Sequence, residues 1–443
     1  MGVIHPLKLI FLSLLVWLFF YVQMSVEYLY DGSTFFPIFT VVVFILSFTL
    51  GMNSLKTNKI KQVISHTHKQ IKQIVFLFFL MGLIGVFLKI YVGFFKSGIF
   101  LADDIFEQRL ENMGKELSGG LIGVLASVMF PFSFITLLIS LYNYKKFSKL
   151  YLFIIAVLGS YPFVETFYMG GRTIIALLGT TFLFVCFATY QKYSKADEIV
   201  IKANKLKLLK LPKFLLKKTV IIPLVLIALL FTTYSINVVA KRLNRFGYGD
   251  KTFRVWERKD YQWVKFDKDF KKGYFKSSQD EKDKMIGLHS LKHYFVHGAV
   301  EYVRLVNDLE KKTGYYYGQY EFNVFFKFFR IFKIPLKSLG DLNEIVKRKS
   351  VYQTFWGPFY IDFGLFGVII LFFWGRFVKR IYIKAKMGST PHVIFYGYLS
   401  TILITSAFLN FLLGSSGYYL FAFLVSLLVF DYFPVINLKT IKK

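Results

Sequence analysis

The chain has 443 residues, of which 55% are hydrophobic and 20% aromatic, and 56 Lys and Arg against 26 Asp and Glu give it a net charge of +30. Several apolar runs of about twenty residues, the length that spans a bilayer, exclude a soluble enzyme. The single cysteine, Cys186, excludes a disulfide framework and a cysteine-based metal site.

Ten apolar runs predict ten transmembrane helices. They cover residues 7–24, 35–52, 74–95, 119–142, 150–168, 173–190, 219–240, 354–375, 392–412 and 417–434. No small-residue cleavage site follows the first run, so we expect an uncleaved signal anchor. The sequence thus predicts an all-α polytopic membrane protein in three regions: helices 1–7 in residues 1–240, a large loop in 241–352, and helices 8–10 with a tail in 353–443.

Lysine and arginine gather in alternate loops, as they do in cytoplasmic loops of membrane proteins. The loop from Asn53 to Gln73 contains five lysines and no acidic residue, whereas the next loop, 103–116, is acidic. This register predicts cytoplasmic termini and an external loop 241–352. About half of the basic residues then act as topology signals and inner-leaflet contacts, which requires no nucleic acid. Residues 191–218 form either a solvated cytoplasmic loop or a basic amphipathic helix on the membrane.

Gly170-Gly171-Arg172-Thr173 separates two apolar runs at their external end. The glycines permit a tight turn and expose amides at the start of the next helix, and Arg172 offers a forked donor for phosphate oxygens. Arg242 and Arg245 follow the seventh run at the same depth, so these arginines predict a pyrophosphate site. Alternatively, Arg172 extends to the interface and pairs with Glu165. Two other basic residues either contribute or have surface explanations: Lys89 and Arg109.

The long external loop has 25 Lys and Arg against 14 Asp and Glu. A loop of this length crosses the membrane regardless of its charge, so the basic excess points to an anionic ligand. Its interleaved aromatic and basic residues either bind a phosphorylated glycan or dock the loop on the membrane surface. These residues are Tyr315–Tyr317, Tyr320, Phe325, Phe326, Lys327, Phe328, Phe329 and Arg330.

A spacing of four places His289, His293 and His297 on one helical stripe, with Glu301 next and Arg304 beneath His297. The stripe suits zinc or a general base, although no H-E-x-x-H signature is present. Ordinary surface histidines are the simplest interpretation, and we expect no metal.

Asp362 lies in the opening of the eighth run, where an ionised carboxylate requires a partner. One of the interfacial arginines is the expected partner. A carboxylate here is also a candidate proton acceptor.

Together these features resemble the bacterial oligosaccharide repeat-unit polymerases, the O-antigen polymerase family. The resemblance rests on Gly170-Gly171-Arg172-Thr173 before an apolar helix, on the large external loop, and on the stretch from Val351 to Gly367 with its Asp362-Phe363-Gly364. The segment from His293 to Gly318 is a weaker match. At the level of layout the resemblance covers nearly the whole chain.

The resemblance implies a C-type membrane glycosyltransferase without a cofactor in the bacterial cytoplasmic (inner) membrane, active on the external face. Such an enzyme transfers a growing glycan from undecaprenyl pyrophosphate to the non-reducing end of a new lipid-linked repeat unit, in O-antigen, capsule or other surface polysaccharide synthesis. A flippase and a chain-length regulator are its implied partners. Arg172, Arg242 and Arg245 would bind pyrophosphate, and His297 or Asp362 would act as the base. Three residues would position substrate: Arg304, Arg330 and Tyr352.

Two other functions remain open from the sequence. An O-antigen ligase uses the same donor but passes the finished glycan to another acceptor. A flippase for lipid-linked glycan is the candidate from another class, although the chain shows no internal repeat of the kind that transporters often contain.

Overall fold

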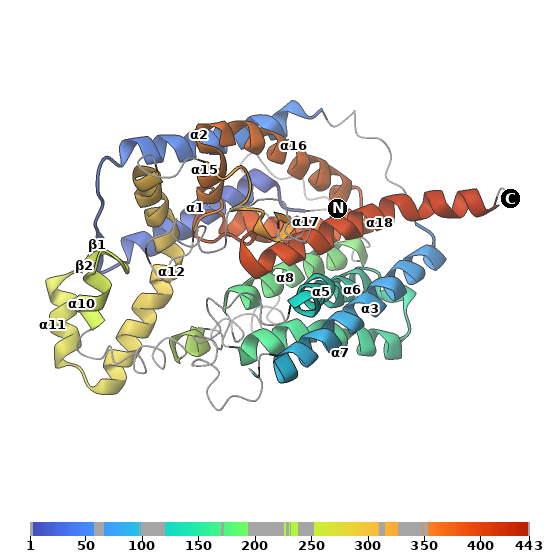
Figure 1. Ribbon diagram of the computed structural model, residues 1–443, viewed down its shortest axis with the longest axis horizontal. Coiled ribbons are helices and arrows are strands. Elements are labelled where there is room, and N and C mark those ends of the chain that lie inside the picture. Colours follow the sequence, from blue (N-terminus) through green and yellow to red (C-terminus); the bar gives the residue numbers. More distant parts are fainter. Residues whose placement is uncertain are drawn as a thin grey trace, which may run out of the picture.

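The computed structural model describes residues 3–56, 66–96, 98, 120–169, 172–193, 226, 230, 232–237, 252–309, 315–326, 348 and 353–441, with side chains up to residue 432 in the last range. Most of these residues are helical (Figure 1). Seven helical stretches among them are long and apolar enough to cross a membrane. They are Phe35–Ser54, His68–Lys96, Leu121–Tyr142, Lys149–Tyr168, Thr173–Tyr193, Gly357–Lys386 and Gly414–Tyr432. This is the architecture of a helical multi-pass membrane protein.

The observed helices match the predicted spans unevenly. Predicted spans 2 to 6 correspond to α2 (Phe35–Ser54), α3 (His68–Tyr91), α5 with α6 (Gly120–Met129, Pro131–Tyr142), α7 (Lys149–Tyr168) and α8 (Thr173–Tyr193). The eighth and tenth correspond to α15 with α16 (Gly357–Phe363, Gly367–Lys386) and to α18 (Gly417–Ile441). The first and ninth are the shorter α1 (Pro6–Val22) and α17 (Thr390–Thr405). Most of the seventh lies outside the described residues.

The predicted loop contains a small folded unit. Its described part includes α10 (Thr252–Glu257), β2 (Val264–Phe266), α11 (Lys268–Lys276) and the long α12 (Gln279–Leu309). Strand β2 pairs antiparallel with β1 (Val26–Tyr28), with Glu27 opposite Lys265. This short two-stranded sheet was not predicted, although the structure as a whole is largely helical, as the sequence predicts. The chain after α1 completes a separate core with β2 and α12, in which Tyr28, Phe253 and Trp256 are buried.

Glycines let several membrane helices approach closely. A Cβ atom on Gly51 of α2 would lie 1.9 Å from the Phe372 carbonyl oxygen of α16, and one on Gly375 of α16 would lie 2.1 Å from the Phe48 carbonyl oxygen of α2. Gly82 of α3 faces α6 in the same way. Small residues at helix crossings permit close backbone packing where lipid provides no hydrophobic driving force between helices.

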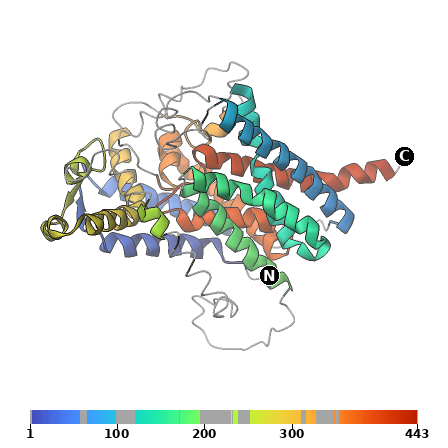
Figure 2. The ribbon, with the colours of Figure 1, turned by 90° about the horizontal axis from the view of Figure 1, so that it is seen from below.

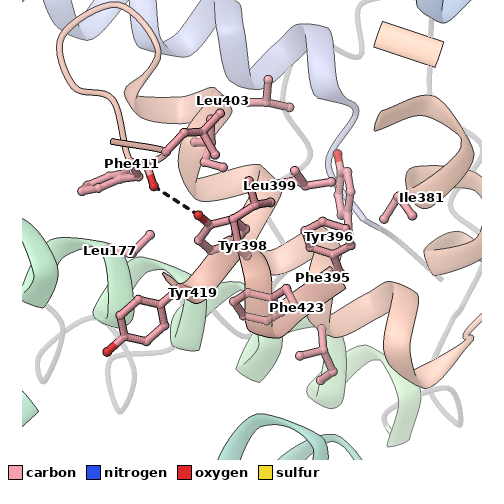
Figure 3. Packing of buried hydrophobic residues seen from close by; sticks show 14 of the residues in the cluster. Leu177, Ile381, Phe395, Tyr396, Tyr398, Leu399, Leu403, Phe411, Tyr419 and Phe423 are labelled. Carbon is pink, nitrogen blue, oxygen red and sulfur yellow. Dashed lines mark hydrogen bonds between the residues drawn. The ribbon is translucent and has the colours of Figure 1, made fainter. Parts of the chain in front are cut away.

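The main core lies where the C-terminal helices cross the middle of the bundle. Phe395 and Tyr398 of α17 stack on Phe423 of α18, and the Tyr398 hydroxyl donates a hydrogen bond to the Phe411 carbonyl (3.1 Å; Figure 3). Because a buried tyrosine needs a partner for its hydroxyl, this bond fixes the chain that joins the two helices. That connection also carries Asn410, whose side chain contacts Glu321.

Side-chain contacts sort the helix ends into two groups. At one end, Lys192 of α8 donates to the Asn143 side chain after α6 (3.0 Å), and Asn143 donates to Thr390 at the start of α17. At the other end, Lys89 late in α3 faces Glu165 late in α7. Figures 1 and 2 both place the small unit, with α11 and the two strands, at the end of the long axis away from the C-terminus.

Candidate functional site

Arg172 immediately precedes α8 and connects it to α12. Its Nη2 donates a hydrogen bond to the Tyr294 hydroxyl, and its Cζ lies 4.2 Å from the centroid of the Tyr294 ring. The other terminal nitrogen, Nη1, is buried and has no hydrogen-bond partner among the described residues. A buried donor without a partner is costly, and a guanidinium is well suited to paired anionic oxygens. The Nη1 donor of Arg172 therefore keeps a hydrogen-bonding capacity that no described residue uses.

Glu165 is not the partner of Arg172. Its carboxylate lies 3.9 Å from the Lys89 ammonium of α3. The pairing of Arg172 with Glu165 that the sequence left open is therefore wrong for the described structure, because α3 and α7 run side by side and bring Lys89 to Glu165 first.

The three histidines of α12 are buried, which corrects their interpretation as surface residues. His289, His293 and His297 are 4%, 4% and 3% exposed. The correction has a simple cause, since β1, β2 and α10 pack over this face of the helix and contribute Tyr28, Phe266 and Trp256 to the same core. No group of three His, Cys, Asp or Glu that could hold a metal ion occurs among the described residues.

The hydrogen bonds of His297 and His293 show which ring nitrogen carries the hydrogen in each. Nδ1 of His297 lies 2.6 Å from the His293 carbonyl oxygen, which only accepts, so Nδ1 carries the hydrogen and Nε2 carries a lone pair. His293 in turn donates from Nε2 to Gln262 (2.6 Å) and accepts from the Tyr28 hydroxyl (3.1 Å). Burial lowers the pKa of His297 to about 4, which keeps its ring neutral at pH 7.

Tyr294 joins Arg172 to His297. The ring of Tyr294 meets the ring of His297 edge to face, with centroids 5.6 Å apart. The structure thus brings together two predicted site residues that are far apart in the chain, an arginine at a membrane-helix end and a neutral imidazole on α12. A cation for a leaving phosphate beside a neutral base is an arrangement that suits glycosyl transfer.

Arg304 braces the small unit. Its guanidinium donates to the carbonyls of Leu29 (3.0 Å), Gln262 (2.9 Å) and Trp263 (2.7 Å), and lies 3.6 Å from Glu301. Only 4% of Arg304 is exposed. These bonds connect α12 to both strand segments, and its predicted part in substrate positioning stays a prediction.

Glu301 and Arg348 form a buried ion pair near Arg304. Nε of Arg348 lies 2.8 and 2.7 Å from the two carboxylate oxygens of Glu301, and its Nη2 lies 3.3 Å from Asp308. Burial raises the pKa of the Glu301 carboxyl, and the adjacent Arg348 opposes that shift. The pair ties the end of the predicted loop to the middle of α12.

Among the described residues, backbone amides hold Asp362, and Arg172 does not pair with it; the other two candidate arginines, Arg242 and Arg245, lie outside this part of the chain. Its carboxylate accepts hydrogen bonds from the amides of Tyr320 (3.0 Å) and Glu321 (2.8 Å), and its own carbonyl accepts one from Tyr317 (2.9 Å). Residues 317–322 pack around the carboxylate near the end of α15 and supply these donors. Glu321 is also fully buried, and both of its oxygens face the Asn410 amide nitrogen (3.1 and 2.8 Å). Burial raises the pKa of Glu321 well above its ordinary value.

Several predicted site residues lie outside the described part of the chain. Arg242, Arg245, Arg330 and Tyr352, with Arg109, belong to this group. Within the described part, sequence reasoning missed Tyr294, Glu321 and Arg348. Tyr294 directly follows His293, so its place beside the histidine stripe could have been found from the sequence. The partners of Glu321 and Arg348 are distant in sequence, and no local pattern indicates them.

The chain matches no protein-family model, no curated protein and no solved structure.

Proposed function

We propose that this protein is a membrane glycosyltransferase that polymerises lipid-linked oligosaccharide repeat units on the external face of a bacterial cytoplasmic membrane. The observation that carries the proposal is the position of Arg172. It stands at the end of a membrane helix, is held by Tyr294, and has a buried nitrogen without a partner among the described residues. A lipid pyrophosphate provides anionic oxygens at this depth.

In this reaction the hydroxyl oxygen of the acceptor sugar bonds to the anomeric carbon of the donor glycan. The bond from that carbon to the pyrophosphate oxygen breaks, and undecaprenyl pyrophosphate leaves. Arg172 stabilises the negative charge that develops on the leaving group, since a fixed cation in a site with little water acts strongly on such charge. Arg242 and Arg245, which the sequence predicts at the same depth as Arg172, are proposed to assist.

The acceptor proton passes to a base, for which the geometry favours His297. Its Nδ1 hydrogen is used by the His293 carbonyl, so Nε2 is the accepting nitrogen. Both oxygens of Asp362 already accept backbone amides, which makes it the weaker candidate. His297 is 3% exposed, so contact between its Nε2 and the acceptor requires the residues packed around it to move.

A gene deletion in the native host tests the proposal. The deletion strain is complemented with the wild type, with Arg172→Ala, and with Arg258→Ala as a control on an exposed arginine of the small folded unit. We expect single repeat units in the deletion strain, and a ladder of long chains restored by the wild type and the control alone. Membrane levels of each variant are compared by immunoblot.

Three results would count against the proposal in different ways. A normal ladder with Arg172→Ala would remove Arg172 from the site. Long chains that stay on the lipid carrier in the deletion strain would indicate a ligase that passes the glycan to its final acceptor. Repeat units that accumulate on the cytoplasmic leaflet would indicate a flippase.

A further inference from the structure

A cavity of about 290 Å³ lies between the ends of the membrane helices. Two of its lining residues are close to Arg172 in the sequence. Met169 and Ile174, which flank Gly170-Gly171-Arg172, are part of its wall. This volume is close to the lower limit of about 300 Å³ for ligand pockets, so it suits one small group. Its lining residues are Lys89, Ser127, Phe130, Pro131, Glu165, Thr166, Met169, Ile174, Ser415, Tyr418 and Tyr419.

The charges of this cavity balance. Lys89 and Glu165 contribute one positive and one negative group, with Nζ and the carboxylate oxygen 3.9 Å apart. That distance is longer than a direct hydrogen bond. A ligand hydroxyl group placed between the two charges would accept a hydrogen bond from the ammonium and donate one to the carboxylate. A balanced pair favours a neutral polar ligand over a phosphate, which would meet the carboxylate.

Hydroxyl groups form the rest of the polar wall. Ser127 donates its hydrogen to the Gly123 carbonyl (2.8 Å), and Thr166 donates to the Pro162 carbonyl (2.6 Å), so each retains oxygen lone pairs that accept. Tyr419 is 3% exposed, and its hydroxyl has no hydrogen-bond partner among the described residues. Figure 3 shows this hydroxyl directed away from the cluster of Tyr398 and Phe423.

An aromatic ring completes the chemistry. The Phe130 ring lines the cavity, and the Lys89 ammonium lies 5.5 Å from its centroid. Sugars combine an apolar ring face, which packs on aromatic rings, with hydroxyls that need both donors and acceptors. A lipid acyl chain offers no hydrogen-bonding group to the ion pair or to the Tyr419 hydroxyl, and buried polar groups without hydrogen bonds weaken binding.

We infer that this cavity binds one neutral sugar residue of the lipid-linked acceptor, beside the chain segment that carries Arg172. The inference rests on the proposed function and adds to it a specificity site on α3, α7 and α18. The Tyr419 hydroxyl and the Lys89–Glu165 pair are its polar contacts with the sugar, and these residues position the acceptor.

Steady-state kinetics tests the inference on the full chain in lipid nanodiscs. The probe is the lipid-linked single repeat unit extracted from the deletion strain. Tyr419→Phe removes only one hydroxyl, and Tyr432→Phe is the matched control on the exposed part of the same helix. We expect the KM for the acceptor to rise about three- to tenfold in Tyr419→Phe, the effect of one lost hydrogen bond, with kcat within about twofold of the wild type. The control should match the wild type.

Photo-crosslinking tests binding without turnover. p-Benzoylphenylalanine replaces Tyr418, which lines the cavity, or Tyr432, and radiolabelled lipid-linked repeat units are added before illumination. We expect labelling at 418 and none at 432, reduced by excess unlabelled repeat units. Labelling without any polymerisation would uphold the cavity and remove the proposed function. Polymerisation with no labelling at 418 and an unchanged KM in Tyr419→Phe would overturn the cavity inference alone, as would displacement of the label by phospholipid.

Discussion

At the scale of single residues, the described structure concentrates its buried charges around α12. Glu301 and Arg348 are 1% and 5% exposed and hydrogen-bonded to each other. Removing Arg348 leaves the buried Glu301 carboxylate without its two short hydrogen bonds and, among the described residues, with only the more distant Arg304 guanidinium, 3.6 Å away. Losing one partner of a buried pair costs far more than the pair contributes over apolar substitutes.

We therefore expect Arg348→Met to destabilise the protein by about 3–5 kcal/mol. Arg258→Met is the control, because Arg258 and Asp260 form an exposed pair worth at most about 1 kcal/mol. The double variant Glu301→Gln with Arg348→Met should recover much of the loss. Thermal unfolding in detergent measures each variant, and an unchanged midpoint in Arg348→Met would contradict the pair's importance.

The buried histidines make a prediction about acid stability. Burial lowers the pKa of His289 from 6.5 to about 3, so the unfolded chain binds the proton more readily than the folded one. The stability from keeping His289 neutral is fully present above about pH 6.5 and declines as the pH falls toward 3.

His289→Leu should reduce this loss, because leucine suits the pocket of Trp256, Phe266 and Phe270 and takes up no proton. The measurement compares the fall in unfolding temperature between pH 7.5 and pH 5 in wild type and variant. His68→Leu, at an exposed position, is the control. An equal fall in His289→Leu would show that His289 does not titrate as its burial implies.

At the scale of elements, glycine contacts set the distances between helices. Gly51→Ala would place a methyl group 1.9 Å from the Phe372 carbonyl oxygen, so α2 and α16 must separate. Overpacking of this kind costs about 1–3 kcal/mol or more. Gly179→Ala in α8, where a Cβ meets nothing within 4 Å, should be neutral or slightly stabilising. A Gly51→Ala protein as stable as Gly179→Ala would contradict the close crossing.

At the scale of the whole molecule, apolar run length predicted most of the membrane helices, because twenty apolar residues admit few other structures. It overestimated α1 and α17, since apolar runs continue into the turns that follow. The stripe period correctly placed the histidines on one face of α12. Nothing local indicated β1, because three residues after a helix form a strand only when β2, from a distant segment, pairs with them.

The site was predicted less completely than the fold. Arg172 and His297 were chosen because each has a local signature, a charge at a membrane boundary and a base on a helix face. Their link through Tyr294, and the choice of Lys89 as partner of Glu165, depend on how helices pack. Packing between distant segments has no local sequence pattern. The distant backbone partners of Asp362 and Arg304 therefore could not be predicted from the sequence.

The alternation of basic loops predicts which end of the molecule faces outward. In a Cys186→Ala background, a cysteine at the exposed Lys272 of α11 should react with a membrane-impermeant maleimide in intact spheroplasts. A cysteine at Met387, 53% exposed after α16, should react only after permeabilisation. The reverse pattern would invert the topology and move the site to the cytoplasmic face.

Transfer by the purified protein tests the central claim most directly. Wild type, Arg172→Lys, His297→Asn and the Arg258→Ala control are each reconstituted with lipid-linked single repeat units, and chain length and released undecaprenyl pyrophosphate are measured together. The account predicts long chains with one pyrophosphate carrier released per linkage in the wild type and control, and a loss of at least about 100-fold in the two site variants, the size expected for a lost charge-stabilising or base group. Undiminished polymerisation by both site variants would contradict it.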